Sequence, residues 1–231
     1  MFFGIDMTYI YLVLPAVLFA LWAQFNVQST FSKYSKVRSR SGMTGYDSAR
    51  RILDANRLHN VGIARVAGNL TDHYNPKDNT IYLSDSVYGE TTAAAIGVAA
   101  HEAGHAVQHA VGYTPMKLRS AIIPVTQIGS NLAMPLFLLG IVLSYPTLAM
   151  IGVIAFGAST LFQLVTLPVE FNASSRAMDA LRGYNLDNDD LKSARRVLTA
   201  AALTYVAALA VSLVNLLRLF LIASRMRGRR D

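Results

Sequence analysis

Four long apolar runs constrain the fold of this chain more than any other feature of its sequence. A helix needs roughly 20 apolar residues to cross a hydrocarbon core of about 30 Å. Each run is about that long, and 53% of the 231 residues are hydrophobic. We therefore expect an integral membrane protein of mainly α class, with about four transmembrane helices. The runs cover about Met7 to Phe25, Ile122 to Leu143, Leu148 to Leu167, and Val197 to Ala223.

The runs predict five parts of the chain. Residues 1–25 are expected to form an N-terminal anchor, because no Lys or Arg precedes the run as in a cleavable signal. Residues 26–121 form a polar region, and residues 122–167 form a membrane hairpin closed by the short stretch "SYPT". A helical region follows at 168–196, and residues 197–231 form a last membrane helix with a basic tail.

Basic residues beside the runs predict the orientation. Cytoplasmic loops carry an excess of Lys and Arg, and residues 26–45 hold four basic and no acidic side chains. Residues 26–121 are then cytoplasmic, and the hairpin returns residues 168–196 to the same side. The Arg-rich C-terminus then lies outside, against the positive-inside rule. We give more weight to residues 26–121 and 168–196, which this orientation places in the cytoplasm. The net charge is +7, and the basic residues behind it cluster beside the apolar runs. This distribution favours a lipid bilayer over nucleic acid as partner.

The polar region is predicted to be a small α+β unit. A helix follows the candidate cap Thr44 through "GYDSARRILDANRL". Strand-prone residues near Ile63 to Val66 and near Ile81 to Leu83 flank the turn signal "NPKD", so we expect a short β-hairpin there. The stretch "SVYGETTAAAIGVAAHEAGHAVQHAVGY" then predicts an Ala-rich, buried helix.

That last helix carries the pattern "HEAGH". His101 and His105 share one helical face, and in this H-E-x-x-H arrangement two imidazoles bind zinc while Glu102 acts as general base. The sequence has no cysteine, so any metal must be held by His, Asp or Glu. A chance match is the alternative, but a glutamate beside two histidines in an Ala-rich helix is costly to bury without a task. We therefore expect one zinc ion as cofactor.

The third zinc ligand has two candidates. His109 lies one turn beyond His105, but residues spaced i, i+4 and i+8 spread over about 12 Å of a straight helix, which favours a supporting or structural role. Glu170 lies in "LPVEFNASSRAMDALRGY", where we expect a helix from about Pro168 to Arg182. The hairpin would return it to the face that carries His105, and two His, one Glu and a water form a known catalytic zinc set. The alternative is that Glu170 only marks the membrane boundary.

The stretches "HEAGHAVQH", "LTDHYNP" and "LPVEFNAS" resemble the YugP-type neutral zinc metallopeptidases, a family of bacterial membrane proteins. The resemblance runs from "TGYDSARRILDAN" to "ALTYVAAL", nearly the whole chain. The plan is similar to that of HtpX-type gluzincins, where a membrane hairpin separates the H-E-x-x-H helix from a helix bearing the Glu ligand in an E-x-x-A-D pattern. Here Ser174 replaces the Asp that supports a zinc histidine, so Ser174 or Asn172 is expected to take that part.

The resemblance implies His101, His105 and Glu170 as zinc ligands and Glu102 as base. It also implies a zincin-like catalytic region in a bacterial membrane protein, and the basic residues described above put that region at the cytoplasmic face of the bacterial cytoplasmic membrane. It also implies an edge strand that holds substrate in extended form by main-chain hydrogen bonds; that strand is Thr80, Ile81, Tyr82 and Leu83.

Three further side chains are weaker candidates. His73 and Tyr74 could donate a hydrogen bond to the oxyanion of a tetrahedral intermediate, or they could simply stabilise the "NPKD" turn. Arg176 is a candidate electrophile or a salt-bridge partner.

These features predict a membrane-anchored zinc endopeptidase whose substrates are polypeptides, membrane proteins among them, in quality control or processing. A site-2 type intramembrane protease is disfavoured, because its third ligand is an Asp within a span and none of the four runs contains Asp. The non-enzymatic alternative is a membrane scaffold or metal-binding protein with a structural zinc site. Such a site needs four protein ligands and no base.

Overall fold

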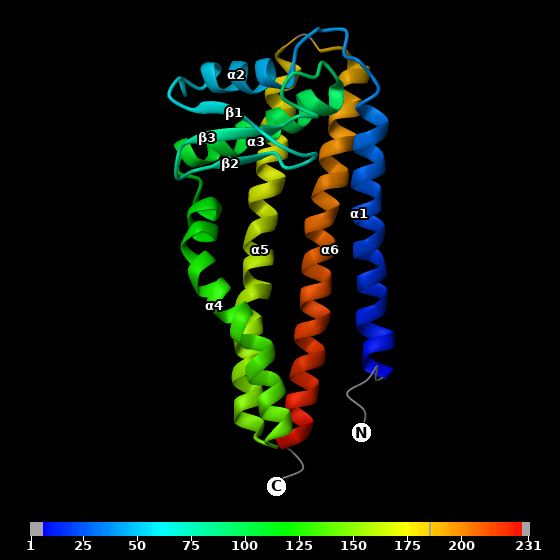
Figure 1. Cartoon of the computed structure of the whole chain (residues 1–231), viewed down its shortest axis with the longest axis vertical. Helices are drawn as coiled ribbons and strands as arrows, with labels where there is room; N and C mark the ends of the chain where they lie inside the picture. Colours follow the sequence, from blue (N-terminus) through cyan, green and yellow to red (C-terminus); the bar gives the residue numbers. More distant parts are fainter. Residues whose placement is uncertain (1–6, 185, 228–231) are drawn as a thin grey trace. The chain divides into compact units, whose positions relative to one another are not determined.

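The computed structural model describes residues 7–184 and 186–227, and this part of the chain is mainly helical (Figure 1). It divides into two compact units: unit 1 holds residues 7–23, 118–167 and 204–227, and unit 2 holds the described residues of 24–117 and 168–203. Three strands lie between the second and third helices: β1 (Gly62–Val66), β2 (His73–Asn75) and β3 (Thr80–Ser84). A π-helical segment, η1 (Tyr9–Val13), precedes the helices α1 (Leu14–Tyr34), α2 (Gly45–Ala55), α3 (Ala93–Ala110), α4 (Thr114–Val142), α5 (Pro146–Arg182) and α6 (Asn188–Arg227).

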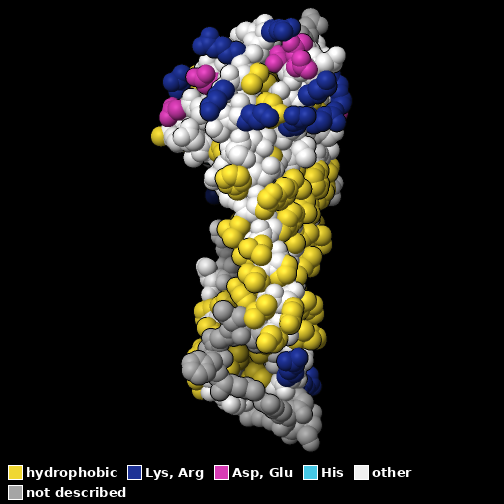
Figure 2. Space-filling view, turned by 90° about the vertical axis from the view of Figure 1, so that its right-hand side faces the viewer, with side chains coloured by type: hydrophobic (Ala, Val, Ile, Leu, Met, Phe, Trp, Pro, Cys, Tyr) yellow, Lys and Arg dark blue, Asp and Glu magenta, His cyan; other side chains and the backbone are white. Residues whose placement is uncertain are grey.

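Unit 1 is built from parts of the long apolar helices. Within the described residues, four helices are long and apolar enough to cross a membrane: Tyr9–Tyr34, Thr114–Val142, Pro146–Arg182 and Asn188–Arg227. The prediction of a mainly α membrane protein with about four such helices and a small α+β region is therefore confirmed. On the face seen in Figure 2, most side chains drawn for the described part of unit 1 are hydrophobic, with a small group of Lys or Arg near the bottom, whereas most Lys, Arg, Asp and Glu gather over unit 2.

Small residues bring the helices of unit 1 close together. A Cβ placed on Gly152 of α5 would lie 2.6 Å from the backbone nitrogen of Phe137 on α4, so the two backbones are in direct contact. The hydroxyls of Thr160 and Ser212 form a 2.7 Å hydrogen bond between α5 and α6. Close backbone approach at small residues and polar contacts between helices are typical of helices packed in a bilayer.

One predicted helix boundary is wrong. The sequence predicted a separate helix from about Pro168, but Pro168 lies inside the continuous helix α5. A proline inside a helix loses one backbone hydrogen bond and costs about 3 kcal/mol, which the packing of this long helix offsets. As a result, Glu170 stands on the same helix as the returning arm of the predicted hairpin.

Helix α3 lies at the centre of unit 2. Seven of its alanines, from Ala93 to Ala106, are buried with at most 1% of their surface exposed. A Cβ on Gly97 would lie 3.1 Å from the Cβ of Ala194 on α6. Burial of small side chains lets the backbones of neighbouring elements come close to α3, and the larger buried side chains of unit 2 fill the space around it: Leu53, Ile81, Leu83, Ile96 and Leu181.

The three strands form one sheet in the order β1-β3-β2. The hairpin predicted between the first and last of these strands is wrong, because β1 pairs with β3 in parallel. The antiparallel neighbour of β3 is β2, and the "NPKD" turn joins these two. A tight turn can join only antiparallel strands, and the brevity of β2 hid its pairing in the sequence.

This strand order also corrects the predicted substrate edge. The strand that contains Thr80, Ile81, Tyr82 and Leu83 lies between β1 and β2, so its backbone pairs on both sides and cannot receive another strand. Ile81 and Leu83 are fully buried in the core of unit 2. Within the described residues the edges of the sheet are β1 and β2.

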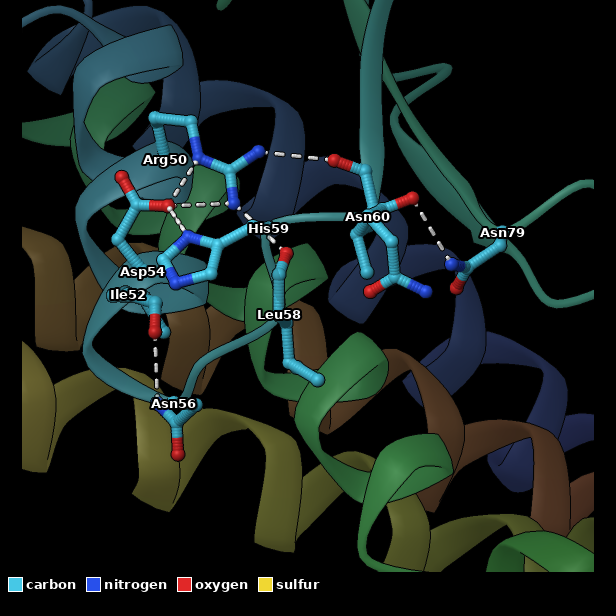
Figure 3. Close-up of polar contacts among 9 residues, drawn as sticks. Arg50, Ile52, Asp54, Asn56, Leu58, His59, Asn60 and Asn79 are labelled. Atoms are coloured by element: carbon cyan, nitrogen blue, oxygen red, sulfur yellow. Dashed lines mark hydrogen bonds and ion pairs between the residues drawn. The ribbon is translucent and has the colours of Figure 1, made fainter.

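Helix α2 begins and ends with specific side-chain contacts. Thr44 and Asp47 form a reciprocal capping box at its first turn. At the other end, the Arg50 guanidinium donates to the carbonyls of Leu58 and Val61 and to the carboxylate of Asp54. Figure 3 shows these bonds fastening the loop before β1 to the helix. The guanidinium donors of Arg50 thus hold this loop against α2.

Candidate metal centre

Three metal-binding side chains from two helices of unit 2 meet at one point. His101 and His105 lie on successive turns of α3, with their ring centroids 4.6 Å apart. The carboxylate of Glu170 comes from α5, and its Oε2 lies 3.3 Å from Nε2 of His101 and 3.5 Å from Nε2 of His105. The candidate ligand atoms all lie within 4.8 Å of one another. Glu170 and His105 are buried, at 3% and 8% exposure.

A glycine sets the distance between these two helices. A Cβ on Gly104 would lie 2.7 Å from the carbonyl oxygen of Ala173, a distance that side chains do not adopt. Gly104 therefore lets the backbone of α5 touch α3 directly beside His105, about one helical turn along α5 from Glu170.

Two polar side chains hold the histidine rings in orientation. Nδ1 of His101 lies 3.1 Å from Oγ of Ser174, in the place expected for the supporting residue. Nδ1 of His105 lies 3.0 Å from Oε1 of Gln108, and since an amide oxygen only accepts, this Nδ1 carries the proton. The Nε2 of His105 is then free to bind a metal.

Gln108 is a residue that the sequence analysis missed. Its side chain is completely buried, and its amide nitrogen donates to the carbonyl of Val169 at 2.8 Å and to Oδ1 of Asn172 at 3.0 Å. Nε of Arg176 donates to the same Asn172 oxygen at 2.8 Å. Arg176 and Asn172 thus connect to His105 through Gln108. A glutamine three residues after the candidate ligand His105, in a helix predicted to be buried, was the available signal.

The charges at the centre favour a cation. Burial lowers the pKa of His105, but its hydrogen bond to Glu170 and the charge of Glu102 raise it more, so the pKa lies above the usual histidine value. The carboxylates therefore stabilise positive charge at this point. Glu102 is only 7% exposed, and no hydrogen-bond partner for its carboxylate is present among residues 7–184 and 186–227.

A second carboxyl group that sequence reasoning missed stands near Glu102. Asp72 accepts hydrogen bonds from the backbone nitrogen and the hydroxyl of Ser84, at 2.8 and 2.9 Å. Burial raises the pKa of Asp72, and the charge of Glu102 adds to the rise. These bonds fix the chain just before β2, so Asp72 holds this edge of the sheet in place near Glu102.

The remaining predicted residues take supporting positions. The hydroxyl of Tyr74 donates to Asn79 and lies 2.9 Å from Nδ1 of His109, so β2 is fastened to α3 through His109. His109 does not belong to the metal-binding group. Nδ1 of His73 lies 2.8 Å from the carbonyl oxygen of Thr71, and the His73 ring stacks on Tyr82. Because the one proton of the Tyr74 hydroxyl is already donated, these contacts favour the turn-stabilising interpretation for Tyr74.

The donor set fits zinc. Two imidazole nitrogens and one carboxylate oxygen are ligands that zinc accepts, and three protein ligands leave one position for a water, as in catalytic sites. Structural zinc sites close with four protein ligands. Within the part of the chain that the structure describes, no fourth His, Asp or Glu joins this group. The geometry therefore matches an open, catalytic type of zinc site.

Comparisons with known proteins agree with this chemistry. The sequence model of a family described as "Putative neutral zinc metallopeptidase" matches residues 9–224. The chain is 48% identical over 218 residues to the "Putative membrane protease YugP" of Bacillus subtilis (strain 168), an alignment that covers 94% of this chain and 96% of that protein. No solved structure matches the chain.

Proposed function

Because this chain belongs to the neutral zinc metallopeptidase family, as its motifs predicted, we propose that it is a membrane-anchored zinc endopeptidase of the gluzincin type. The observation that carries the proposal is the meeting of His101, His105 and Glu170 on two helices that the close contact at Gly104 holds together. These three side chains would hold one zinc ion, and Glu102 would be the general base.

Each residue then has a defined part in peptide hydrolysis. A bound zinc ion would polarise the scissile carbonyl and lower the pKa of a water in its open position to about 7. The carboxylate of Glu102 takes a proton from the water that attacks the scissile carbonyl, and it delivers this proton to the leaving amine. Ser174 and Gln108 keep the two histidine rings oriented throughout, because each holds an Nδ1.

The substrate backbone would pair with β2. The corrected sheet order leaves β2 as the edge nearer the site, since Tyr74 of this strand contacts His109 of α3. Main-chain pairing with a sheet edge holds a peptide in extended form with little dependence on its sequence. Thr71 to Asn75 would therefore take the part expected of the Thr80 to Leu83 strand.

We place the active unit at the cytoplasmic face of the bacterial cytoplasmic membrane. The basic residues at 33–40 support this side by the positive-inside rule. Four membrane crossings would put unit 2 on one side and would require only that the C-terminal arginines lie outside. Substrates would then be polypeptides at that face, and membrane proteins under quality control or processing are the class we favour.

A single substitution separates an enzyme from a metal-binding scaffold. In Glu102→Gln the three proposed ligands are unchanged, so purified protein should keep one zinc per chain while peptide cleavage falls by about 10²–10⁴-fold or more. A Glu102→Gln variant that cleaves as fast as the parent would refute the mechanism.

A second pair of variants tests the ligand set. Glu170→Ala should lose bound zinc, whereas the control His109→Ala should retain it, because His109 lies outside the metal-binding group. The opposite result, with zinc lost only from the His109 variant, would overturn the assignment.

A further inference from the structure

Two amide side chains lie exposed on α4, one of the helices long and apolar enough to cross a membrane. Gln127 and Asn131 both belong to the part of α4 that lies in unit 1, and neither has a hydrogen bond to a residue that the structure describes. Asn131 follows Ile122, where the apolar run begins, by about 14 Å of helix at 1.5 Å per residue. In a hydrocarbon core of about 30 Å it would lie near the middle.

The Asn131 amide points away from the helix that packs against α4 at this depth. A Cβ on Gly129 would lie 3.0 Å from the carbonyl oxygen of Ala155 on α5, and a Cβ on Gly152 of α5 would lie 2.7 Å from the carbonyl oxygen of Ala133. Successive residues of a helix turn by about 100°. Asn131 stands two residues from both Gly129 and Ala133, so it lies about 160° around α4 from each. Helix α5 therefore cannot supply a partner for this amide.

An unpartnered amide inside a bilayer is unfavourable. It gives up its hydrogen bonds to water on entering hydrocarbon, and lipid tails offer none in return. Between membrane helices, Asn and Gln side chains recover this loss by bonding to a neighbouring helix. The exposed amides of α4 thus indicate a face that another helix covers.

The amides belong to a longer pattern on this face. Gln127, Asn131, Met134 and Leu138 follow one another at spacings of four, three and four residues. All four side chains are exposed, Met134 at 44% and Leu138 at 42%. This alternation is the heptad spacing along which two helices pack in a left-handed pair. We call these four residues the amide seam.

The amide seam is complementary to itself. Copies of this chain inserted in the same direction carry each residue at the same depth, so in a twofold pair Asn131 meets Asn131. An amide has both a donor nitrogen and an acceptor oxygen, so two identical amides can bond reciprocally. One asparagine at a core position of paired helices also fixes the register of a parallel pair. A different membrane protein would have to present a polar residue at this same depth.

We propose that a second copy of this chain docks on the amide seam, with the α4 helices parallel and the two Asn131 amides hydrogen-bonded to each other in the bilayer. The Gln127 amides meet in the same way two turns nearer unit 2 than Leu138, and the Met134 and Leu138 side chains pack below them. The proposal concerns unit 1 alone and does not rest on the proposed peptidase function.

Single cysteines test the position of the contact. The sequence has no cysteine, so an introduced one reports only on its own place. Met134 and Leu132 lie half a turn apart and are similarly exposed, at 44% and 48%, but only Met134 belongs to the amide seam. Under mild oxidation in phosphatidylcholine vesicles, Met134→Cys should form linked dimers at least about fivefold faster than Leu132→Cys, because a disulfide needs Cα atoms within about 7 Å. Equal rates would overturn the proposed face.

Energy transfer between donor- and acceptor-labelled chains tests the role of the amide. Asn131→Leu should need about five- to tenfold more protein per lipid than the parent to reach the same transfer, because it removes the hydrogen bond between the copies. The control Leu132→Ala should match the parent. Circular dichroism of each variant checks that its helices are intact, which is expected since both side chains are exposed.

Two results would contradict the proposal. Absence of energy transfer in the parent at every protein-to-lipid ratio would show that the chain is a monomer. If, in addition, Asn131→Leu slowed the cleavage of a peptide joined to a membrane helix but not of the same peptide in solution, the amide seam would bind a substrate helix in place of a second copy.

Discussion

The substitution Gly104→Ala tests whether the contact between α3 and α5 determines metal binding. The new methyl group would lie 2.7 Å from the carbonyl oxygen of Ala173, whereas ordinary contact begins at 3.4 Å. The methyl group is attached to the backbone of α3, and the Ala173 oxygen belongs to the backbone of α5. Neither can rotate away as the end of a flexible side chain can. The helices must therefore separate by roughly 0.7 Å at this point, or the local structure must distort.

The size of this shift exceeds what a zinc site tolerates. Zinc–nitrogen and zinc–oxygen distances are about 2.0–2.2 Å, and a sound site keeps them within about 0.2 Å. The expected helix separation is about three times this tolerance. It should therefore lower zinc affinity on the order of tenfold to a hundredfold, the range seen when a residue that supports a metal ligand is lost. Stability should fall less, because overpacking costs about 1–3 kcal/mol while alanine gains about 1 kcal/mol over glycine in a helix.

Competition with a chelator measures the zinc affinity, and thermal unfolding in detergent measures the stability. The control is Gly157→Ala on α5, the helix that Gly104 of α3 contacts; there the nearest atom to the new Cβ is a Leu216 side-chain carbon at 4.0 Å. This control should bind zinc like the parent. If Gly104→Ala also binds zinc and cleaves peptides like the parent, the spacing of α3 and α5 does not depend on Gly104.

Three further variants examine the supporting residues and the fold. Ser174→Ala should weaken zinc binding about tenfold. Ser174→Asp should strengthen it relative to the parent, because a carboxylate is a better acceptor than a hydroxyl for the Nδ1–H of His101. Equal zinc affinities of the two variants in chelator competition would count against this role of Ser174. Gln108→Ala leaves Nδ1 of His105 without its acceptor and should lower both zinc affinity, by about 10–100-fold, and the free energy of unfolding, by about 1–3 kcal/mol; an unchanged melting temperature would contradict the second expectation. Thr44→Ala removes a helix cap and should cost about 1 kcal/mol in denaturant unfolding with no change in zinc affinity, and a loss of zinc affinity would show that α2 influences the site.

The parts of the site that depend on helical spacing could be predicted from the sequence. His101 and His105 are one turn apart on a helix, so their shared face follows from the period of 3.6 residues alone. The contribution of Glu170 followed from chain direction, because two apolar runs joined by a short turn return the chain to its starting side. Both inferences need only local structure and the constraint that a bilayer imposes.

The contacts that depend on packing could not be predicted. Gln108 meets Val169 and Asn172, which lie more than 60 residues away in the chain, and nothing in its neighbourhood identifies those partners. Asp72 likewise becomes part of the site only through the sheet that holds it beside Glu102. The predicted strand pairing was wrong for a related reason. With three residues, β2 shows too little alternation of apolar and polar side chains to be recognised in the sequence.

If Glu170 is the third ligand, as proposed, its position after residues 122–167 also limits when the protein can become active during its synthesis. A growing chain that has reached residue 167 already carries His101, His105 and Glu102. It still lacks the third ligand, and the wall that α5 provides against α3 through Gly104 and Ala173 has not been made. On the proposed function, the nascent chain is inactive at this stage. It would gain peptidase activity only after the two apolar runs of residues 122–167 have been made, when the chain would already be held in the membrane.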